Sequence, residues 1–120
     1  MRFESEDGTV ISVGKNSLQN ERLTQSARGD EIWLHAKDMP GSHVILVTEG
    51  EEPSEADYTE AAEIAAKYSS ANADLVAVDY TRVKNVKKPP AAKPGLVIYH
   101  TNWTAYVTPD AEEIKRMREK

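Results

Sequence analysis

The segment of residues 31–37 alternates regularly between side chains of different kinds, and this alternation constrains the fold most. Two sets of three side chains fall on opposite faces of an extended strand: Ile32, Leu34 and Ala36, and Trp33, His35 and Lys37. A turn with Pro40 and Gly41 follows, and residues 43–48 are rich in β-branched side chains. The segment therefore predicts a β-hairpin, and with it a sheet.

Similar patterns predict the other elements. The expected strands are residues 1–6, 9–13, 74–83, 96–101 and 103–107, with the first two joined by the turn Asp7-Gly8. The expected helices are residues 17–27, 54–70 and about 109–120, the last carrying only a weak apolar pair and expected to fray. We therefore expect an α+β fold, a mostly antiparallel sheet with one long helix and a shorter helix packed on it. The 120 residues suit a single domain, 1–120.

Composition excludes several classes of protein. The chain has no cysteine, which rules out a disulfide scaffold, thiol catalysis and zinc sites built from cysteine. No apolar run approaches the roughly 20 residues that span a bilayer, and the acidic start does not resemble a signal peptide. We therefore expect no membrane partner and a cytoplasmic location.

Charge is segregated along the chain, although the net charge is −5. Residues 49–63, the acidic segment, contain seven acids and no base, whereas residues 82–93, the basic segment, contain five bases and no acid. Such a chain can present a positive face despite its acidic balance. Two solvated surface segments remain the simpler interpretation of the charges alone.

Candidate catalytic and metal motifs are weak. Gly8 to Lys15 departs from the spacing of a phosphate-binding loop. His35, His43 and His100 lack the spacing of a known metal motif, and Ser42 and His43 point to opposite faces of a strand, so they cannot pair. We expect no catalytic residue, no metal and no cofactor.

A nucleic-acid surface agrees better with the residues. Trp33, His35 and Lys37 would offer two rings and a cation on one strand face. Lys15 and Asn16 precede a helix whose first N–H groups favour a phosphate. The basic segment begins on the strand that carries Tyr80. Considered alone, Trp33 is better explained as a buried core residue. Considered together, these residues make a nucleic-acid surface as good an explanation as a core tryptophan and solvated charges.

Four strings carry a family resemblance: GKNSLQNERLT (14–24), DEIWLHAKDMPGSHVIL (30–46), EAAEIAAKYSSA (60–71) and VDYTRVKNVKKPPAAKPGLVIY (78–99). They closely resemble the RNA-binding domain of NFACT proteins, NFACT-R, over about residues 14–107. The resemblance implies tRNA or large-subunit rRNA as partners, in ribosome-associated quality control. It also implies a module that usually ends a longer chain, in some bacteria labelled a fibronectin-binding protein, so this chain is either stand-alone or excised.

The resemblance, carried over residue by residue, implies a set of candidate RNA contacts. They are Lys15, Asn16, Gln19, Asn20, Trp33, His35, Lys37, Ser42, His43, Tyr80, Arg82, Lys84, Lys87, Lys88 and Lys93. The main hypothesis is a non-catalytic RNA-binding domain. Two alternatives stay open: a subunit of an RNA-modification system, and a protein-interaction module that docks a ribosomal protein through the acidic segment. The sequence leaves the oligomeric state open.

Overall fold

The computed structural model describes residues 1–99, 102–109, 114 and 117–119. Within them, a seven-stranded antiparallel sheet has the order β8-β5-β3-β4-β2-β1-β9. Its strands are β1 (Arg2–Glu4), β2 (Val10–Val13), β3 (Ile32–Ala36), β4 (Val44–Val47), β5 (Val76–Arg82), β8 (Trp103–Val107) and β9 (Arg118–Glu119). The helices are α1 (Ser17–Ser26), α2 (Glu55–Lys67) and the short 3-10 helix η1 (Val83–Asn85). A separate pair, β6 (Val86–Lys87) and β7 (Ile98–Tyr99), forms a small second sheet.

Both predicted hairpins are confirmed. β1 and β2 pair in antiparallel register across the turn at Asp7 and Gly8, and Gly8 has the positive φ of 85° that such a turn requires. β3 pairs with β4 on one side and with β5 on the other. β3 therefore lies inside the sheet, where side chains on both of its faces are available for burial.

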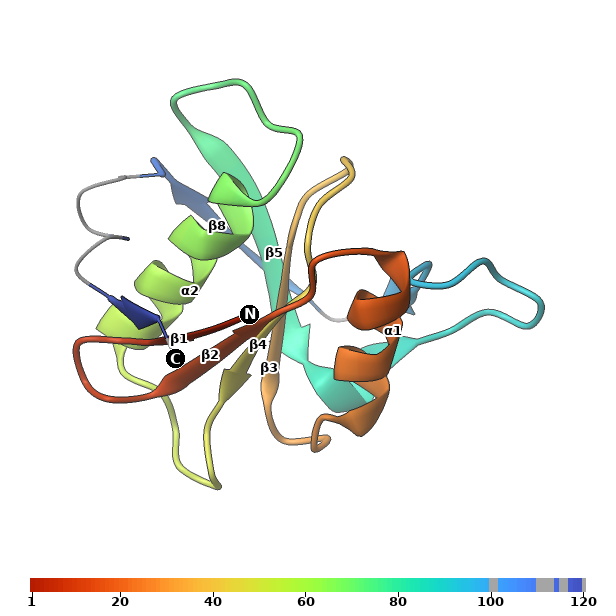
Figure 1. The fold of residues 1–120 in the computed structure, drawn as a ribbon, viewed down its shortest axis with the longest axis horizontal. Coiled ribbons are helices and arrows are strands. Elements are labelled where there is room, and N and C mark those ends of the chain that lie inside the picture. Colours follow the sequence, from red (N-terminus) through yellow and green to blue (C-terminus); the bar gives the residue numbers. More distant parts are fainter. Residues whose placement is uncertain (100–101, 110–113, 115–116, 120) are drawn as a thin grey trace.

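Helix α2 covers one face of the sheet (Figure 1). Ile32, Leu34 and Ala36 of β3 face it, as the alternation predicts, and the small side chains of Ala61 and Ala65 let it pack close. A capping box starts α2: the Ser54 side chain accepts from the Asp57 N–H, and the Asp57 carboxylate accepts from the Ser54 N–H. This face holds the main hydrophobic core.

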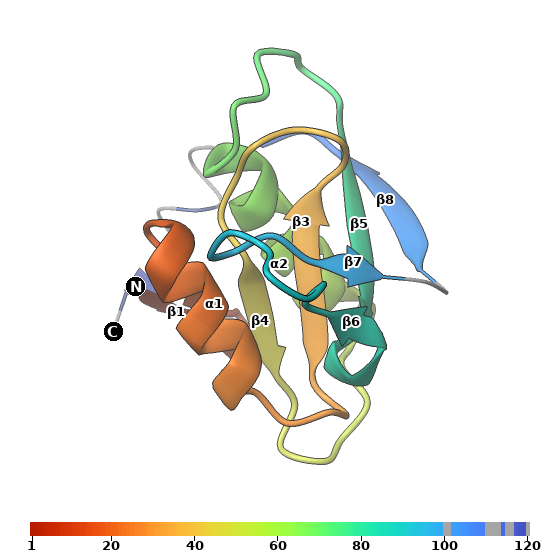
Figure 2. The same cartoon turned by 90° about the vertical axis from the view of Figure 1, so that its right-hand side faces the viewer.

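The opposite face is covered by α1 and by residues 86–99, which we call the arm (Figure 2). A second core cluster of Trp33, Ile45 and Val83 lies there, packed against Leu23 of α1 and residues of the arm. The α+β class and the antiparallel sheet are thus confirmed, but the sheet lies between two layers. The distinction between one long and one short helix is not confirmed, because α2 has 13 residues and α1 has 10.

The expected helix over 109–120 falls largely outside the described residues. In the described part, Arg118–Glu119 form β9, which pairs with β1, so a helix continuing to the end of the chain is wrong. Ile114 and Met117 nevertheless pack in the main core, as expected for the apolar pair of this segment. Among the described residues, no helix is long and apolar enough to cross a membrane.

Candidate nucleic-acid interface

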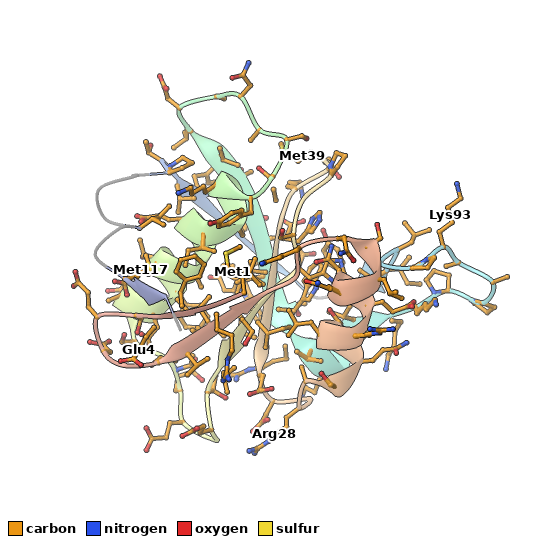
Figure 3. All side chains as sticks on the ribbon, viewed as in Figure 1. Met1, Glu4, Arg28, Met39, Lys93 and Met117 are labelled. Atoms are coloured by element: carbon orange, nitrogen blue, oxygen red, sulfur yellow. The ribbon has the colours of Figure 1, made fainter. Side chains whose placement is uncertain are left out.

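A cavity of about 640 Å³, called the pocket below, opens between three parts of the chain. Its wall includes β3 with the loop that follows it, the first turns of α1, and the end of the arm, in which Lys93 and Gly95 lie. Three strings that are far apart in sequence therefore meet at one place. Figure 3 shows Met39 at the β3–β4 loop and Lys93 projecting from the arm.

Aromatic rings form one side of the pocket. The Trp33 and His35 rings are stacked, with centroids 5.6 Å apart and planes 5° from parallel. His43 meets both rings edge-on, and Tyr99 of the arm lies 4.8 Å from the Trp33 ring centroid. Trp33 is only 1% exposed, so its ring supports the wall from within.

Both histidines of this wall favour the neutral state. Burial lowers the pKa of His35, opposed by backbone hydrogen bonds at Ala36 and Gly41 and by the charge of Asp79. Burial, with a smaller contribution from His35, lowers the pKa of His43 to about 4. Each ring can therefore both donate and accept a hydrogen bond at neutral pH, and neither attracts a phosphate as a cation would.

His43 and Asn20 tie three elements together. The Thr24 hydroxyl lies 2.8 Å from His43 Nδ1, the His43 backbone N–H donates to Asn20 Oδ1 at 3.0 Å, and Gly95 hydrogen-bonds the His43 ring through its backbone. Both side chains are buried, at 2% and 7% exposed. They hold α1, β4 and the arm in position, and both residues also line the pocket.

The basic segment runs alongside α1 in the opposite direction. The Lys84 N–H donates to the Gly29 carbonyl beyond the end of α1, and the Lys88 ammonium pairs with Glu21 in its middle. Gly95 then lies against the first helical residue, Ser17. A Cβ at Gly95 would stand 3.1 Å from the Ser17 carbonyl oxygen, so the close approach requires glycine.

Asp79 anchors the arm and β8 to the sheet. Its buried carboxylate accepts from the Tyr99 hydroxyl at 2.6 Å and from the Thr104 hydroxyl at 2.7 Å. The Lys37 ammonium lies 3.6 Å from the same carboxylate. Lys37 is thus exposed but partly neutralised.

The predicted site residues separate into three groups. Exposed cations on the side of α1 and the arm are Lys15, Lys84, Lys87, Lys88 and Lys93. Near the pocket, Asn16 caps α1, Gln19 accepts from the Lys15 N–H, and the half-buried Ser42 donates its backbone N–H to Tyr68. The contacts of Asn16, Gln19 and Ser42 stabilise the fold.

Tyr80 and Arg82 belong to a third group, on the other face of the sheet. Tyr80 packs against Tyr58 of α2, and the Arg82 guanidinium pairs with Glu52 and donates to the Asp30 carbonyl. The expectation of one patch that includes these two residues is wrong, because strand alternation sends their side chains toward α2.

Trp33 and His43, two of the candidate RNA contacts, are buried beneath α1 and the arm, and both line the pocket. The burial of Trp33 agrees with the interpretation of that residue taken alone, but the alternation does not reveal what covers this face. The continuous apolar run Val44–Val47 was the available signal, since such runs indicate burial on both faces.

Several residues that line the pocket were not among the candidate RNA contacts predicted from the sequence. Met39, Pro40, Leu96 and Tyr99 line the cavity, and Ser17 and Gly95 bring its two sides together. The signal that could have found them is the presence of most of them in the same strings that carry the family resemblance.

A metal site receives no support from the described residues, which include no group of three or more histidine, aspartate, glutamate or cysteine side chains placed to hold an ion. His100, the third histidine of that alternative, lies outside the described residues. His35 and His43 have ring centroids 5.5 Å apart and meet edge-on.

Comparison with known proteins identifies the family of the chain. The family model described as the NFACT protein RNA binding domain matches residues 1–101. The Rqc2 homolog RqcH of Bacillus subtilis (strain 168) is 49% identical over 118 residues, covering 97% of this chain and 20% of that protein. The Rqc2 homolog RqcH of Streptococcus pneumoniae (strain D39) is 47% identical over 120 residues, covering 98% of this chain and 22% of that protein.

A solved structure has the same fold. It is the C-terminal part of the fibronectin/fibrinogen-binding protein from Streptococcus suis, which superposes with a TM-score of 0.93 at 46% identity, covering 98% of this chain and 48% of that one. The chain spans only about a fifth of the length of the curated relatives. With the family model matching most of its length, this chain belongs to the NFACT protein RNA-binding domain family.

Proposed function

We propose that this domain binds tRNA or large-subunit rRNA in ribosome-associated quality control, through the surface formed by α1 and the arm, and that it acts without catalysis. Family membership supports RNA as the ligand. The names of the curated relatives, Rqc2 homologs, support the quality-control setting, and the proposal includes action at ribosomes in the cytoplasm.

The observation that carries the proposal is the course of the basic segment along α1. Contacts at Gly29, Glu21 and Ser17 keep the segment against α1 from one end of the helix to the other. They keep the stretch of chain that carries the exposed Lys84, Lys87 and Lys93 on the side of the sheet opposite α2 (Figure 2). Phosphate binding needs cations of this kind on one surface.

The acidic segment supports the same orientation. Part of it forms α2 and part the loop that precedes it, on the other side of the sheet. Glu49, Glu51 and Glu55 of this segment are exposed there. RNA approaching the arm therefore meets lysines first, while the acids repel it from the α2 side.

Recognition through phosphates follows from the burial of the aromatic residues on this face. Trp33 lies below the surface and gives no open platform for a row of bases. Affinity then depends mainly on released counterions, so it falls steeply with salt and depends little on base sequence.

Charge reversal tests the proposal with a matched control. Lys87→Glu on the arm and Lys67→Glu on α2 change the net charge by the same amount, and both side chains are exposed. We expect Lys87→Glu to weaken tRNA binding severalfold and to reduce the salt slope by about 0.7–0.9 for each lost contact. The triple exchange of Lys84, Lys87 and Lys88 to Glu should nearly abolish binding.

The measurement is fluorescence anisotropy with labelled tRNA and with a large-subunit rRNA fragment at several salt concentrations. Lys67→Glu should bind like the parent. Equal weakening by Lys67→Glu and Lys87→Glu would show that only total charge matters, and the assignment of the arm would then be wrong. Hydrolysis or modification of either RNA by the purified domain would contradict a non-catalytic role.

A further inference from the structure

We propose that the pocket receives the base of one unpaired nucleotide of the bound RNA. This inference rests on the proposed function and adds a ligand to a cavity that the phosphate contacts do not use. The domain would then combine backbone contacts along the arm with capture of one base beside α1.

The size and composition of the pocket suit a base. Its volume of about 640 Å³ lies in the range of small-ligand sites, and its wall combines rings with a few polar groups. The half-buried His35 ring lines the pocket, and the buried Trp33 ring stacks beside it, so this part of the wall is packed before any ligand arrives. Single-stranded nucleic acid is commonly held by stacking on such rings.

The polar groups of the wall suit the edge of a base better than a phosphate. The lowered pKa of His35 keeps its imidazole neutral, and backbone hydrogen bonds at Ala36 and Gly41 already engage the ring, so it acts on a base mainly as an uncharged aromatic face. The Asp38 carboxylate, also at the wall, accepts from the N–H groups that bases carry and disfavours a buried anion. The indole N–H of Trp33 is buried with no hydrogen-bond partner among the described residues, and Trp33 also lines the pocket.

The rim of the pocket suits the phosphate that the base brings with it. Lys93 is exposed and belongs to the wall, and it is the only lysine or arginine there among the described residues. Ser17 begins the ten-residue helix α1 at the same wall, where backbone N–H groups favour an anion. Base and phosphate groups thus find different partners at neighbouring positions.

The test compares three labelled hairpin RNAs with the same stem: one blunt, one with a single unpaired 3′ nucleotide, and one with an abasic residue in place of that nucleotide. We expect the unpaired base to raise the affinity of the parent by about fivefold to a hundredfold over the blunt and abasic RNAs. His35→Ala should reduce that advantage to less than twofold while still binding the blunt hairpin. Lys67→Ala, on the α2 side, should keep the full advantage.

A second measurement does not depend on substitution in the pocket. The chain has two tryptophans, so Trp103→Phe leaves Trp33 as the only one. Its fluorescence should change on adding the RNA with the unpaired nucleotide and not on adding the abasic RNA.

The outcomes separate the two proposals. If the parent binds all three RNAs equally and Trp33 fluorescence does not respond, the base pocket is wrong and the phosphate-binding surface stands. If the parent binds none of them, nor tRNA, both proposals are wrong. If the advantage of the unpaired base persists in folded His35→Ala, the base is bound elsewhere.

Discussion

The His35 imidazole lies parallel to the Trp33 indole, with ring centroids 5.6 Å apart and planes within 5°. Both residues line the pocket, and the Trp33 ring is also buried in a core, so packing in the core sets the geometry of the candidate site. Alternate positions on β3 share a face, which brings the two rings together. The contacts of Trp33 with His43 and Tyr99 then fix its orientation.

Replacing Trp33 should therefore cost stability, in contrast to replacing the other tryptophan. Trp33→Ala removes a large side chain that is 1% exposed and should lower the free energy of unfolding by about 3–5 kcal/mol. Trp103→Ala, at a side chain that is 55% exposed, should lower it by about 1 kcal/mol or less. Urea denaturation measures both, and equal losses would contradict the burial of Trp33 beneath α1 and the arm.

The stability of the domain should fall as the pH drops from about 6.5 toward 4. The pKa of His43 is lowered to about 4 and that of His35 is also lowered, so the unfolded chain binds protons first. The stabilising contribution is complete above pH 6.5 and is lost as pH falls through the folded pKa. For His43 it amounts to at most about 3 kcal/mol.

Denaturation at pH 7 and pH 5 measures this loss, and NMR titration of the imidazole protons assigns it to residues. His43→Gln should reduce the difference between the two pH values, because it removes one titrating imidazole while His35 and the carboxylates remain. An unchanged difference in that variant would show that His43 is not the source of the acid sensitivity.

Gly8 and Gly95 have nearly the same positive φ but different surroundings. Replacing each with alanine therefore separates the cost of backbone strain from the cost of a steric clash. A Cβ at Gly8, with φ of 85°, meets nothing within 4 Å, whereas a Cβ at Gly95, with φ of 83°, meets the Ser17 carbonyl at 3.1 Å. Gly8→Ala should cost about 1–2 kcal/mol from strain alone. Gly95→Ala should cost more and should also weaken RNA binding, because the arm must move away from α1.

Thermal unfolding and RNA anisotropy of the two variants provide the comparison. RNA binding by Gly8→Ala should equal that of the parent, since the β1–β2 turn is remote from the arm. If Gly95→Ala keeps full RNA affinity at a temperature where it is folded, the position of the arm does not matter for binding.

The sequence predicts much of the sheet and less of the site. Alternation in residues 31–37 gives the strand and the separation of its faces, and the turns at Gly8 and Gly41 give the hairpins. Alternation does not reveal what covers each face, so Trp33 beside His35 and Lys37 resembles a surface residue. Its burial depends on α1 and the arm, which reach it only through tertiary packing.

The same limit applies to the charges. A run of bases in residues 82–93 does not show that Arg82, still in β5, points toward α2 while the lysines that follow leave the sheet. The 3-10 turn of η1 redirects the chain between them. The pocket likewise depends on the return of Gly95 to α1, a contact between residues far apart in the sequence.

Tyr99→Phe tests the anchoring of the arm by Asp79. The variant keeps the ring against Trp33 but loses the hydroxyl that donates to the buried carboxylate at 2.6 Å. Because the acceptor is charged, the loss should be about 1.5–3 kcal/mol in the free energy of unfolding. Thr104 and Lys37 still contact Asp79, which keeps the variant folded.

The fall in the free energy of unfolding at alkaline pH provides a measurement that is specific to the Tyr99 hydroxyl. Burial and the hydrogen bond to Asp79 raise the pKa of Tyr99. Tyrosine of the unfolded chain begins to ionise at about pH 10. The contribution of Tyr99 to the free energy of unfolding is therefore complete below that pH and is lost as the pH rises through the folded pKa. Tyr99→Phe should remove that part of the decline. Tyr58, whose pKa burial and Glu52 raise to about 12, should keep the remainder. Denaturation of parent and variant between pH 8 and pH 11 measures the difference, and identical profiles would mean that Tyr99 does not donate to Asp79 in solution.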